Sequence, residues 1–222
     1  MADEFAESCH AAFGDRVHCL VAPLLRVTPL RPGTLPPHRG GIIFTSRSAV
    51  AVVREFYPEL TGTAFCVGAR TAADAEKAGF SAISADADAD GLIRLIAKAR
   101  PTGPLLHLHG RHTRGDIAAT LSAQGVATAS REIYHQRPLG LSGAARELLG
   151  SGRPCLVPLF SPRTAGLFQT AVGPNPPAAL RVLALSAAVA EAYGQTIEIA
   201  ARPNAEAMLE LMAETLSETD SS

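Results

Sequence analysis

A three-part pattern that occurs twice limits what this chain can fold into. Its first copy reads GIIFTSRSAVAVVREF, AFCVGARTAADAEKAGF and SAISADADADGLIRLIAKA, and its second reads CLVPLFSPRTAGLFQTAV, RVLALSAAVAEAYG and TIEIAARPNAEAMLELMAETL. Each part is a short apolar run, then a small or hydroxylated residue, then a helical pattern. Ser46 and Ser161 occupy the same place in the two copies, as do Gly68 and Ser186. The repeat predicts two similar α/β halves.

Strand and helix patterns alternate along most of the chain, which indicates parallel sheets with right-handed crossovers. Prolines exclude a regular helix from 23–37. Glycines at 79 and 125 follow helical patterns and are expected to end those helices. We expect helices at 4–13, 48–56, 72–78, 91–99, 116–124 and 143–149, and strands at 17–22, 41–45, 64–67, 82–84, 105–108, 126–134, 155–160, 182–185 and 196–199.

The strand count predicts one continuous and one discontinuous domain. Residues 32–134 hold four complete strand–helix units, whereas the chain from 139 onward holds only three. The N-terminal segment supplies the missing helix and strand, so domain 1 comprises 1–28 and 138–222, and domain 2 comprises 32–134. The chain then crosses between domains near 28–31 and 134–138, which predicts a two-stranded linker.

Charge and cysteine content exclude several classes of protein. The formal net charge of −1 argues against binding to nucleic acid, which usually requires a basic stripe. Apart from Lys77 and Lys98 every basic residue is Arg, which suits carboxylate recognition but also reflects codon bias in a GC-rich genome. No apolar run is long enough to span a bilayer. The four scattered cysteines and the absence of a secretory h-region predict a reduced, cytoplasmic protein.

Small and hydroxylated residues recur where predicted strands end and helices begin. In open α/β sheets ligands bind beyond the carboxyl ends of the strands, where helix N-termini attract anions. An ordinary N-cap requires the same residue types, and at any single position it is the simpler interpretation. Because the positions are topologically equivalent, the set indicates an anion-binding cleft: Ser46, Gly68, Thr71, Ser161 and Ser186.

Tyr134 lies at the end of the last predicted strand of domain 2, where the chain crosses back. Placed in a cleft, its phenol would donate a proton to a leaving group. The alternative is an aromatic residue that packs the linker, and the sequence leaves both interpretations open.

Three groups of residues suggest metal sites, and we expect none of them to bind metal. His107, His109 and His112 have metal-like spacing but no local acidic partner. The pairs at 9–10 and 18–19 combine Cys with His, but only a helix-to-strand turn would bring them together. The ADADAD run at 85–90 is more simply a loop whose acidic groups favour the next helix N-terminus.

No dinucleotide fingerprint, P-loop or nucleophile elbow is present in the chain. The lack of a nucleotide fingerprint argues against a dehydrogenase or a kinase. A protein that acts without a cofactor fits better.

The chain resembles the uroporphyrinogen-III synthase family from about residue 4 to 216. In the first half the resemblance rests on IIFTSRSAV, on VGARTAADAEKAGF and on the spaced set Gly110, Arg114, Leu121, Gly125 and Ile133-Tyr134. In the second half it rests on FSPRTAGLF, LALSAAVAEAYG and RPNAEAMLELM. Each motif is weak alone, and their order and spacing together are fairly specific.

The resemblance implies an α/β fold of two similar flavodoxin-like parallel-sheet domains joined by a two-stranded linker. It implies a monomeric, cofactor-free hydro-lyase that closes the linear tetrapyrrole hydroxymethylbilane into uroporphyrinogen III, with loss of water and inversion of ring D through a spiro intermediate. Tyr134 would assist departure of the hydroxyl. The substrate's eight carboxylates would bind at Ser46, Gly68, Thr71, Ser161 and Ser186.

Two departures from the family pattern bear on activity. Relatives usually begin with a short strand and an Arg-Pro turn, whereas this chain begins in the following helix, so we expect a gap beside 17–22. Either the start lies upstream of Met1 or the chain is a degenerate paralogue. Val189 also stands where many relatives have threonine. The alternatives to the synthase are a non-catalytic two-domain paralogue that binds a tetrapyrrole or another polyanion, and a regulatory protein whose clefts bind nothing.

Overall fold

The computed structural model describes residues 2–30, 33–113 and 115–220 and divides the chain into two compact units. Unit 1 comprises Met1–Arg26 and Pro138–Ser222, and unit 2 comprises Val27–Arg137. Unit 1 is therefore built from both ends of the chain, and unit 2 from its middle. Residues 31 and 32, at the expected domain boundary, lie outside the described residues.

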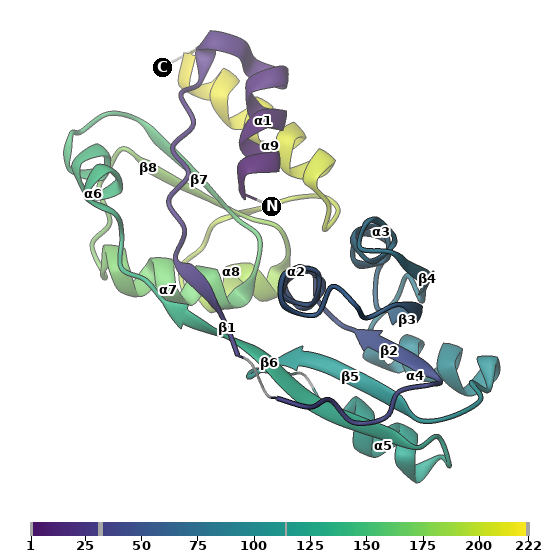
Figure 1. The fold of residues 1–222 in the computed structure, drawn as a ribbon. Helices are drawn as coiled ribbons and strands as arrows, with labels where there is room; N and C mark the ends of the chain where they lie inside the picture. The colour runs from purple at the N-terminus through teal and green to yellow at the C-terminus, as the bar shows by residue number, and fades with distance from the viewer. Residues whose placement is uncertain (1, 31–32, 114, 221–222) are drawn as a thin grey trace. The chain divides into compact units, whose positions relative to one another are not determined.

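Unit 2 contains a six-stranded sheet in the order β1-β6-β5-β2-β3-β4 (Figure 1). The pairs from β6 to β4 are parallel, as the alternation of strands and helices predicted. Its strands are β1 Leu25–Pro29, β2 Gly41–Phe44, β3 Gly62–Cys66, β4 Phe80–Ser84, β5 Leu105–Gly110 and β6 Thr128–Pro138, and its helices are α2 Arg47–Phe56, α3 Ala69–Lys77, α4 Ala89–Ala99 and α5 Ile117–Ala123.

Apolar side chains on both faces of the sheet make the core of unit 2. All four residues of β2 are buried, as expected for a central parallel strand. Ile42 and Phe44 pack against α2 and α3 on one face, whereas Ile43 packs against α4 and α5 on the other. Because successive side chains of a strand point to opposite faces, this short run supplies both halves of the core.

The helix ends of unit 2 follow the expected chemistry. Ser46, Asp88 and Asp116 are N-caps whose side chains accept hydrogen bonds from backbone N–H groups three residues on. The predicted glycine stops are confirmed: Gly79 and Gly125 have φ of 93° and 84°, in the region that favours glycine. The sequence thus determines where each strand gives way to a helix at the carboxyl edge of the sheet.

Unit 1 contains a three-stranded parallel sheet in the order β7-β8-β9, with helices on both faces. Cys9 of α1 packs with Met208 and Met212 of α9 over Leu183 of β8, so α1 and α9 cover one face. Leu141, Ala165 and Phe168 belong to the cluster on the other face. Its elements are α1 Ala2–Phe13, the 3-10 turn Gly14–Arg16, α6 Gly143–Gly150, β7 Cys155–Leu159, α7 Pro162–Val172, β8 Leu180–Ala184, α8 Ala187–Tyr193, β9 Glu198–Ile199 and α9 Ala205–Asp220.

The strand expected at 17–22 is wrong. These residues carry no regular secondary structure, and Leu20 and Val21 are exposed by 40% and 36%. An apolar run becomes a strand only when another strand satisfies its backbone groups. Among the described residues none pairs with this segment.

β7 forms one edge of the described unit 1 sheet. Cys155 donates its N–H to Ala179, and Leu159 accepts from Leu185, so alternate residues of β7 bond towards β8. The backbone of Pro158, between them, faces the open side, where proline offers no N–H to a further strand. Proline at this position is typical of an edge strand. Because Pro158 has no N–H, β7 offers one backbone donor fewer to any strand that would pair with it, including the segment 17–22.

None of the described helices is both long enough and apolar enough to cross a membrane.

Candidate functional site

The repeated sequence pattern becomes a repeated structural unit, in which a parallel strand ends at a small residue that begins a helix. Ser46 links β2 to α2, and Gly68 precedes α3 just beyond β3. Ser161 and Ser186 take the same places before α7 and α8 in unit 1. These positions lie at the carboxyl edge of each sheet, where open α/β sheets bind ligands.

Ser46 and Tyr134 lie in direct contact in unit 2. The Oγ of Ser46 is 2.7 Å from the phenol oxygen of Tyr134, and either group is able to donate. Ser46 also accepts the N–H of Ala49 at 3.2 Å, so the N-cap fixes its hydroxyl. Tyr134 is only 7% exposed. The structure therefore joins a predicted acid and a predicted binding residue in one hydrogen-bonded pair.

Thr71 is a buried hydroxyl residue in the first turn of α3, 8% exposed. Its backbone N–H bonds to Gly68. A hydroxyl at a helix N-terminus suits a polar ligand. An ion pair between Arg47 and Asp74 connects α2 with this helix.

The start of α3, at Gly68, is partly occupied by a carboxylate of the chain itself. Asp86 accepts the N–H of Ala69 at 2.9 Å and the hydroxyl of Ser84 at 3.1 Å. Its φ of 47° is in the left-handed region that Asp tolerates better than most residues. Two aspartates of the ADADAD run thus accept hydrogen bonds from helix N-termini, since Asp88 likewise accepts the N–H of Gly91 in α4. Gly68 accordingly offers less to an external anion than Ser46 does.

The two serines of unit 1 differ in how their hydroxyls are used. Ser161 Oγ lies 2.8 Å from the hydroxyl of Thr164 and accepts the Thr164 N–H at 3.2 Å, so it is a closed local cap. Pro162 also removes one N–H from the first turn of α7. Ser186 makes no side-chain cap bond to α8. Because β7 and β8 are paired, Ser161 and Ser186 follow neighbouring strands of one sheet.

Of the three histidines expected not to bind metal, His107 and His109 lie on β5 and His112 lies in the loop that follows it. His107 is 2% exposed, and its Nε2 is 3.5 Å from the hydroxyl of Thr45. The His107 and His109 rings have centroids 4.7 Å apart, and His112 is exposed. Burial lowers the pKa of His107 to about 4, so this imidazole is neutral near pH 7.

The Cys–His pairs at 9–10 and 18–19 lie in unit 1. Cys9 is buried and its thiol interacts with that of the exposed Cys19, so the two thiols are close. His10 and His18 are exposed. Among the described residues no group of three or more His, Cys, Asp or Glu side chains is arranged to hold a metal ion.

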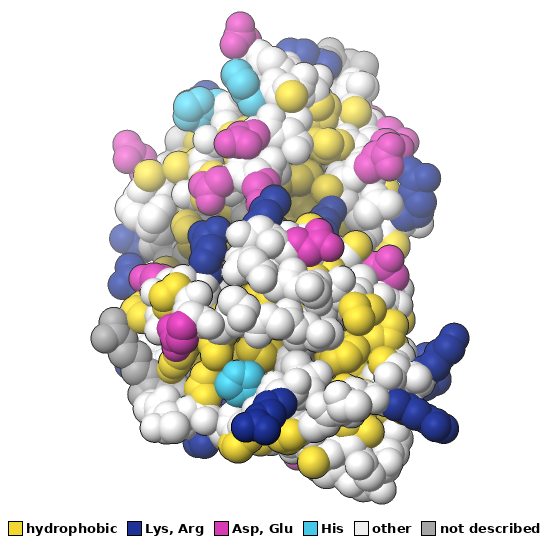
Figure 2. All heavy atoms as spheres, turned by 45° about the vertical axis from the view of Figure 1, so that its right-hand side comes forward, with side chains coloured by type: hydrophobic (Ala, Val, Ile, Leu, Met, Phe, Trp, Pro, Cys, Tyr) yellow, Lys and Arg dark blue, Asp and Glu magenta, His cyan; other side chains and the backbone are white. Residues whose placement is uncertain are grey.

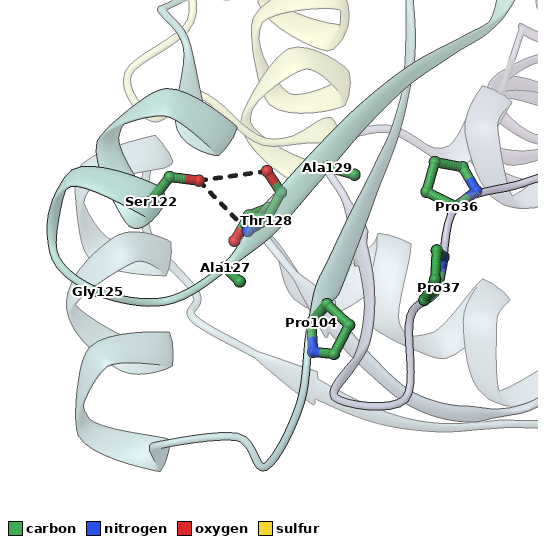
Figure 3. A pocket seen from close by; sticks show the side chains of 8 residues that line it. All are labelled: Pro36, Pro37, Pro104, Ser122, Gly125, Ala127, Thr128 and Ala129. Atoms are coloured by element: carbon green, nitrogen blue, oxygen red, sulfur yellow. Dashed lines mark hydrogen bonds between the residues drawn. The ribbon is translucent and has the colours of Figure 1, made fainter.

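An open groove lies at the opposite end of the unit 2 sheet (Figure 3). Ser122 and Thr128 bond to each other there at 3.3 Å, so they offer little to a ligand. No lining residue is charged, which makes this groove a poor site for a polyanion: Pro36, Pro37, Pro104, Ser122, Gly125, Ala127, Thr128 and Ala129. On the face drawn in Figure 2, basic and acidic side chains are interspersed and form no single basic band.

Sequence reasoning missed two groups that shape the site. The acidic run predicts partners for the N-terminus of α4, whereas the carboxylate of Asp86 bonds to the first turn of α3. Gly110 was noted only for its spacing, although a glycine that ends a buried strand often marks a close approach of another group. Arg114, from the same spaced set, lies outside the described residues.

The comparisons with known proteins agree with one another. The family model described as uroporphyrinogen-III synthase HemD matches residues 4–210. The crystal structure of uroporphyrinogen-III synthetase from Helicobacter pylori 26695 is similar, with a TM-score of 0.68, 15% identity, and coverage of 86% of this chain and 91% of that one. A mutant uroporphyrinogen III synthase from the extremely thermophilic bacterium Thermus thermophilus gives a TM-score of 0.53 at 13% identity, with 98% and 95% covered.

At these identities the structural similarities establish the fold, which is the two-domain α/β architecture with mostly parallel sheets. A sequence comparison with curated proteins finds no significant match. The family model covers most of the chain, from α1 into α9. The chain therefore belongs to the uroporphyrinogen-III synthase family.

Proposed function

We propose that this protein is a uroporphyrinogen-III synthase, which cyclises hydroxymethylbilane with loss of water and inversion of ring D, without a cofactor. The observation that carries the proposal is the contact between Tyr134 and Ser46 at the carboxyl edge of the unit 2 sheet, in a chain of this family. Tyr134 lies within β6 and not at its end, and its phenol is held beside the N-terminus of α2 by Ser46, where it is placed to act on a leaving hydroxyl.

In the first step the phenol of Tyr134 donates its proton to the terminal hydroxyl of the substrate, which departs as water. The adjacent pyrrole nitrogen supplies the electron pair and becomes an azafulvene cation. Ring D attacks this cation through its substituted carbon, and the resulting spiro centre rearranges to the type III isomer. The proton lost when the last pyrrole regains aromaticity returns to the phenolate, so the net change is loss of one water.

Ser46 supports this step from its N-cap position. Its lone pairs receive the Ala49 N–H, and its hydroxyl remains available to the phenol. A hydroxyl that donates to Tyr134 stabilises the phenolate once the proton has left, because hydrogen bonds to a charged group are the stronger ones. We therefore assign Ser46 to proton handling as well as to substrate binding.

The substrate carboxylates would bind at helix N-termini. Thr71 is the strongest candidate after Ser46, because it places a hydroxyl in the first turn of α3. Ser186 has an uncommitted hydroxyl, whereas Ser161 bonds to Thr164, and Gly68 lies next to a position that Asp86 already occupies. Holding a folded substrate in one orientation supplies much of the rate, since orientation alone lowers barriers substantially.

The test is a cyclisation assay that separates the isomers. The purified protein, supplied with hydroxymethylbilane, should yield the type III isomer, whereas the spontaneous product is type I. Tyr134→Phe should lower kcat by about 10²-fold or more, while the loss of one hydrogen bond costs about 1 kcal/mol of stability. Tyr57→Phe is the matched control, because Tyr57 is also in unit 2 but lies beyond the end of α2.

Only type I product from folded wild-type protein would refute the synthase. Thermal stabilisation by uroporphyrinogen without turnover would identify the non-catalytic binding paralogue instead. The observation that favours this second candidate is Val189, which is 1% exposed and carries no hydroxyl at a position where many relatives have threonine.

A further inference from the structure

The strands β5 and β6 change register where Tyr134 is held. Their pairing runs regularly from Leu105 to His109 and then shifts, so that Gly110 lies opposite Tyr134. The N–H of Arg111 donates to the carbonyl of Tyr134 at 3.0 Å, which fixes the two chains beyond the shift. Such irregularities commonly re-aim a side chain next to a functional site.

Gly110 leaves room for the ring of Tyr134. A Cβ at position 110 would lie 2.5 Å from both Cε2 and Cζ of that ring, and 2.9 Å from its hydroxyl oxygen. These distances are far inside van der Waals contact, so the ring occupies the space that any side chain would need. The φ of Gly110 is not in the left-handed region, so the backbone itself does not require glycine. The close approach of the phenol is what excludes a side chain.

His109 forms a hydrogen bond with the backbone carbonyl of Gly110, the residue that contacts the Tyr134 ring. Its Nδ1 is 2.7 Å from the carbonyl oxygen of Gly110, and its Nε2 is 2.7 Å from the hydroxyl of Ser130 on β6. A carbonyl only accepts, so Nδ1 carries the proton, and in the neutral ring Nε2 accepts from Ser130. The imidazole thereby ties the Gly110 carbonyl to the neighbouring strand.

The phenol is fixed from a second direction by Ser46. Its Oγ lies 2.7 Å from the Tyr134 oxygen, and the α2 N-cap holds that serine in place. The ring therefore rests on Gly110 while its hydroxyl bonds to Ser46. A displacement of the ring would break this hydrogen bond.

We propose that Gly110 is a positioning residue for Tyr134, and that the His109 clamp on its carbonyl keeps the ring in register with Ser46. The effect on catalysis rests on the proposed function, whereas the placement of the ring does not. The two parts are therefore tested by different measurements.

The first measurement follows the ring itself. Protein labelled with ¹³C at tyrosine Cζ contains three such carbons, and Tyr134→Phe identifies the resonance of interest. Gly110→Ala should shift the Tyr134 resonance and leave those of Tyr57 and Tyr193 in place. Gly150→Ala is the control, because a Cβ there meets nothing within 4 Å and the φ of Gly150 is not positive. An unmoved Tyr134 resonance in Gly110→Ala would overturn the proposal.

A double-mutant cycle covers the case in which Gly110→Ala folds poorly. Urea denaturation should show a clear loss of stability for Gly110→Ala with Tyr134 present, and a much smaller loss when Tyr134→Ala has removed the ring. Equal losses in both backgrounds would mean that the added methyl group clashes elsewhere, and the proposal would be wrong.

The catalytic part is measured as type III product. Gly110→Ala should lower kcat by about tenfold or more with little change in KM, because small misplacements of a reacting group cost up to about 10²-fold. In a Tyr134→Phe background the same substitution should have almost no further effect on kcat. A shifted resonance with unchanged kcat would overturn the catalytic part and leave the ring placement intact. If wild-type protein makes no type III product, the proposed function fails, and the resonance and the cycle still decide the role of Gly110.

Discussion

Lowering the pH should destabilise unit 2 through His107. This side chain is 2% exposed in the middle of β5, where it lies between Ile43 and Ser130 on the neighbouring strands. Burial lowers its pKa from 6.5 to about 4, and repulsion from His109 acts in the same direction, against a smaller opposing effect of Asp116. The folded protein therefore keeps this ring neutral under conditions that protonate it in the unfolded chain.

The size and sign of the effect follow from proton linkage. Between about pH 6.5 and pH 4 the unfolded state binds more protons than the folded state, so stability falls as the pH falls through this window. A difference of about 2.5 pKa units corresponds to about 3 kcal/mol, of which about 2 kcal/mol is already lost at pH 5. Above about pH 6.5 this group contributes no pH dependence. The loss is a large share of the roughly 5–15 kcal/mol that stabilises a typical domain.

The assay compares wild type with His107→Gln by urea denaturation at about pH 7.5 and about pH 5. Other groups titrate as well, so the informative quantity is the difference in unfolding free energy between the two proteins. That difference should move by about 2 kcal/mol in favour of His107→Gln at the lower pH. His112→Gln, at an exposed position, controls for the removal of an imidazole. A difference that stays constant between the two pH values would refute the reasoning.

Two further predictions concern the α3 N-terminus and the thiols. Asp86→Asn should lower the free energy of unfolding by about 0.5 kcal/mol at low salt, because a carboxylate at a helix N-terminus is stabilising. This loss should be smaller in about 1 M salt, which screens the interaction. A loss of the same size at both salt concentrations would argue against an electrostatic origin. In thiol alkylation followed by mass spectrometry, the exposed Cys19 should react first. Cys66 and Cys9, whose pKa values burial raises to about 12 and about 11, should react only on unfolding, and rapid labelling of Cys66 in folded protein would contradict this.

Local patterns predicted most elements of unit 2 because each strand there is a continuous apolar run that ends at a cap or a glycine. The β2–Ser46–α2 segment is the clearest case, since the strand, the cap and the amphipathic helix all follow from adjacent residues. The segment 17–22 shows the limit of this approach. Its apolar pattern is strand-like, but a strand also needs a partner, and the pattern contains no information about one.

The candidate site was predictable in its positions and not in its contacts. The sequence predicts both Ser46 and Tyr134 at strand ends, which is correct for Ser46 and wrong for Tyr134, because β6 continues to Pro138. The two residues are far apart along the chain, and only the strand order β6-β5-β2 brings them together. The same holds for Asp86, which reaches α3 because β4 lies beside β3. Gly110 depends on a register shift that no local pattern signals. Contacts made across a sheet require the topology first.

The two copies of the repeat have diverged in what their serines offer to a ligand. In unit 2 the hydroxyl of Ser46 bonds to the phenol of Tyr134. In unit 1 the equivalent Ser161 closes on Thr164, and Pro162 removes a backbone donor from the same turn. The two helix N-termini therefore differ, because Ser46 lies beside a phenol whereas Ser161 bonds to a residue of its own helix. Under the proposed function this asymmetry assigns the chemical step to the carboxyl edge of the unit 2 sheet and leaves unit 1 the task of holding carboxylates, which Ser186 is better placed than Ser161 to perform.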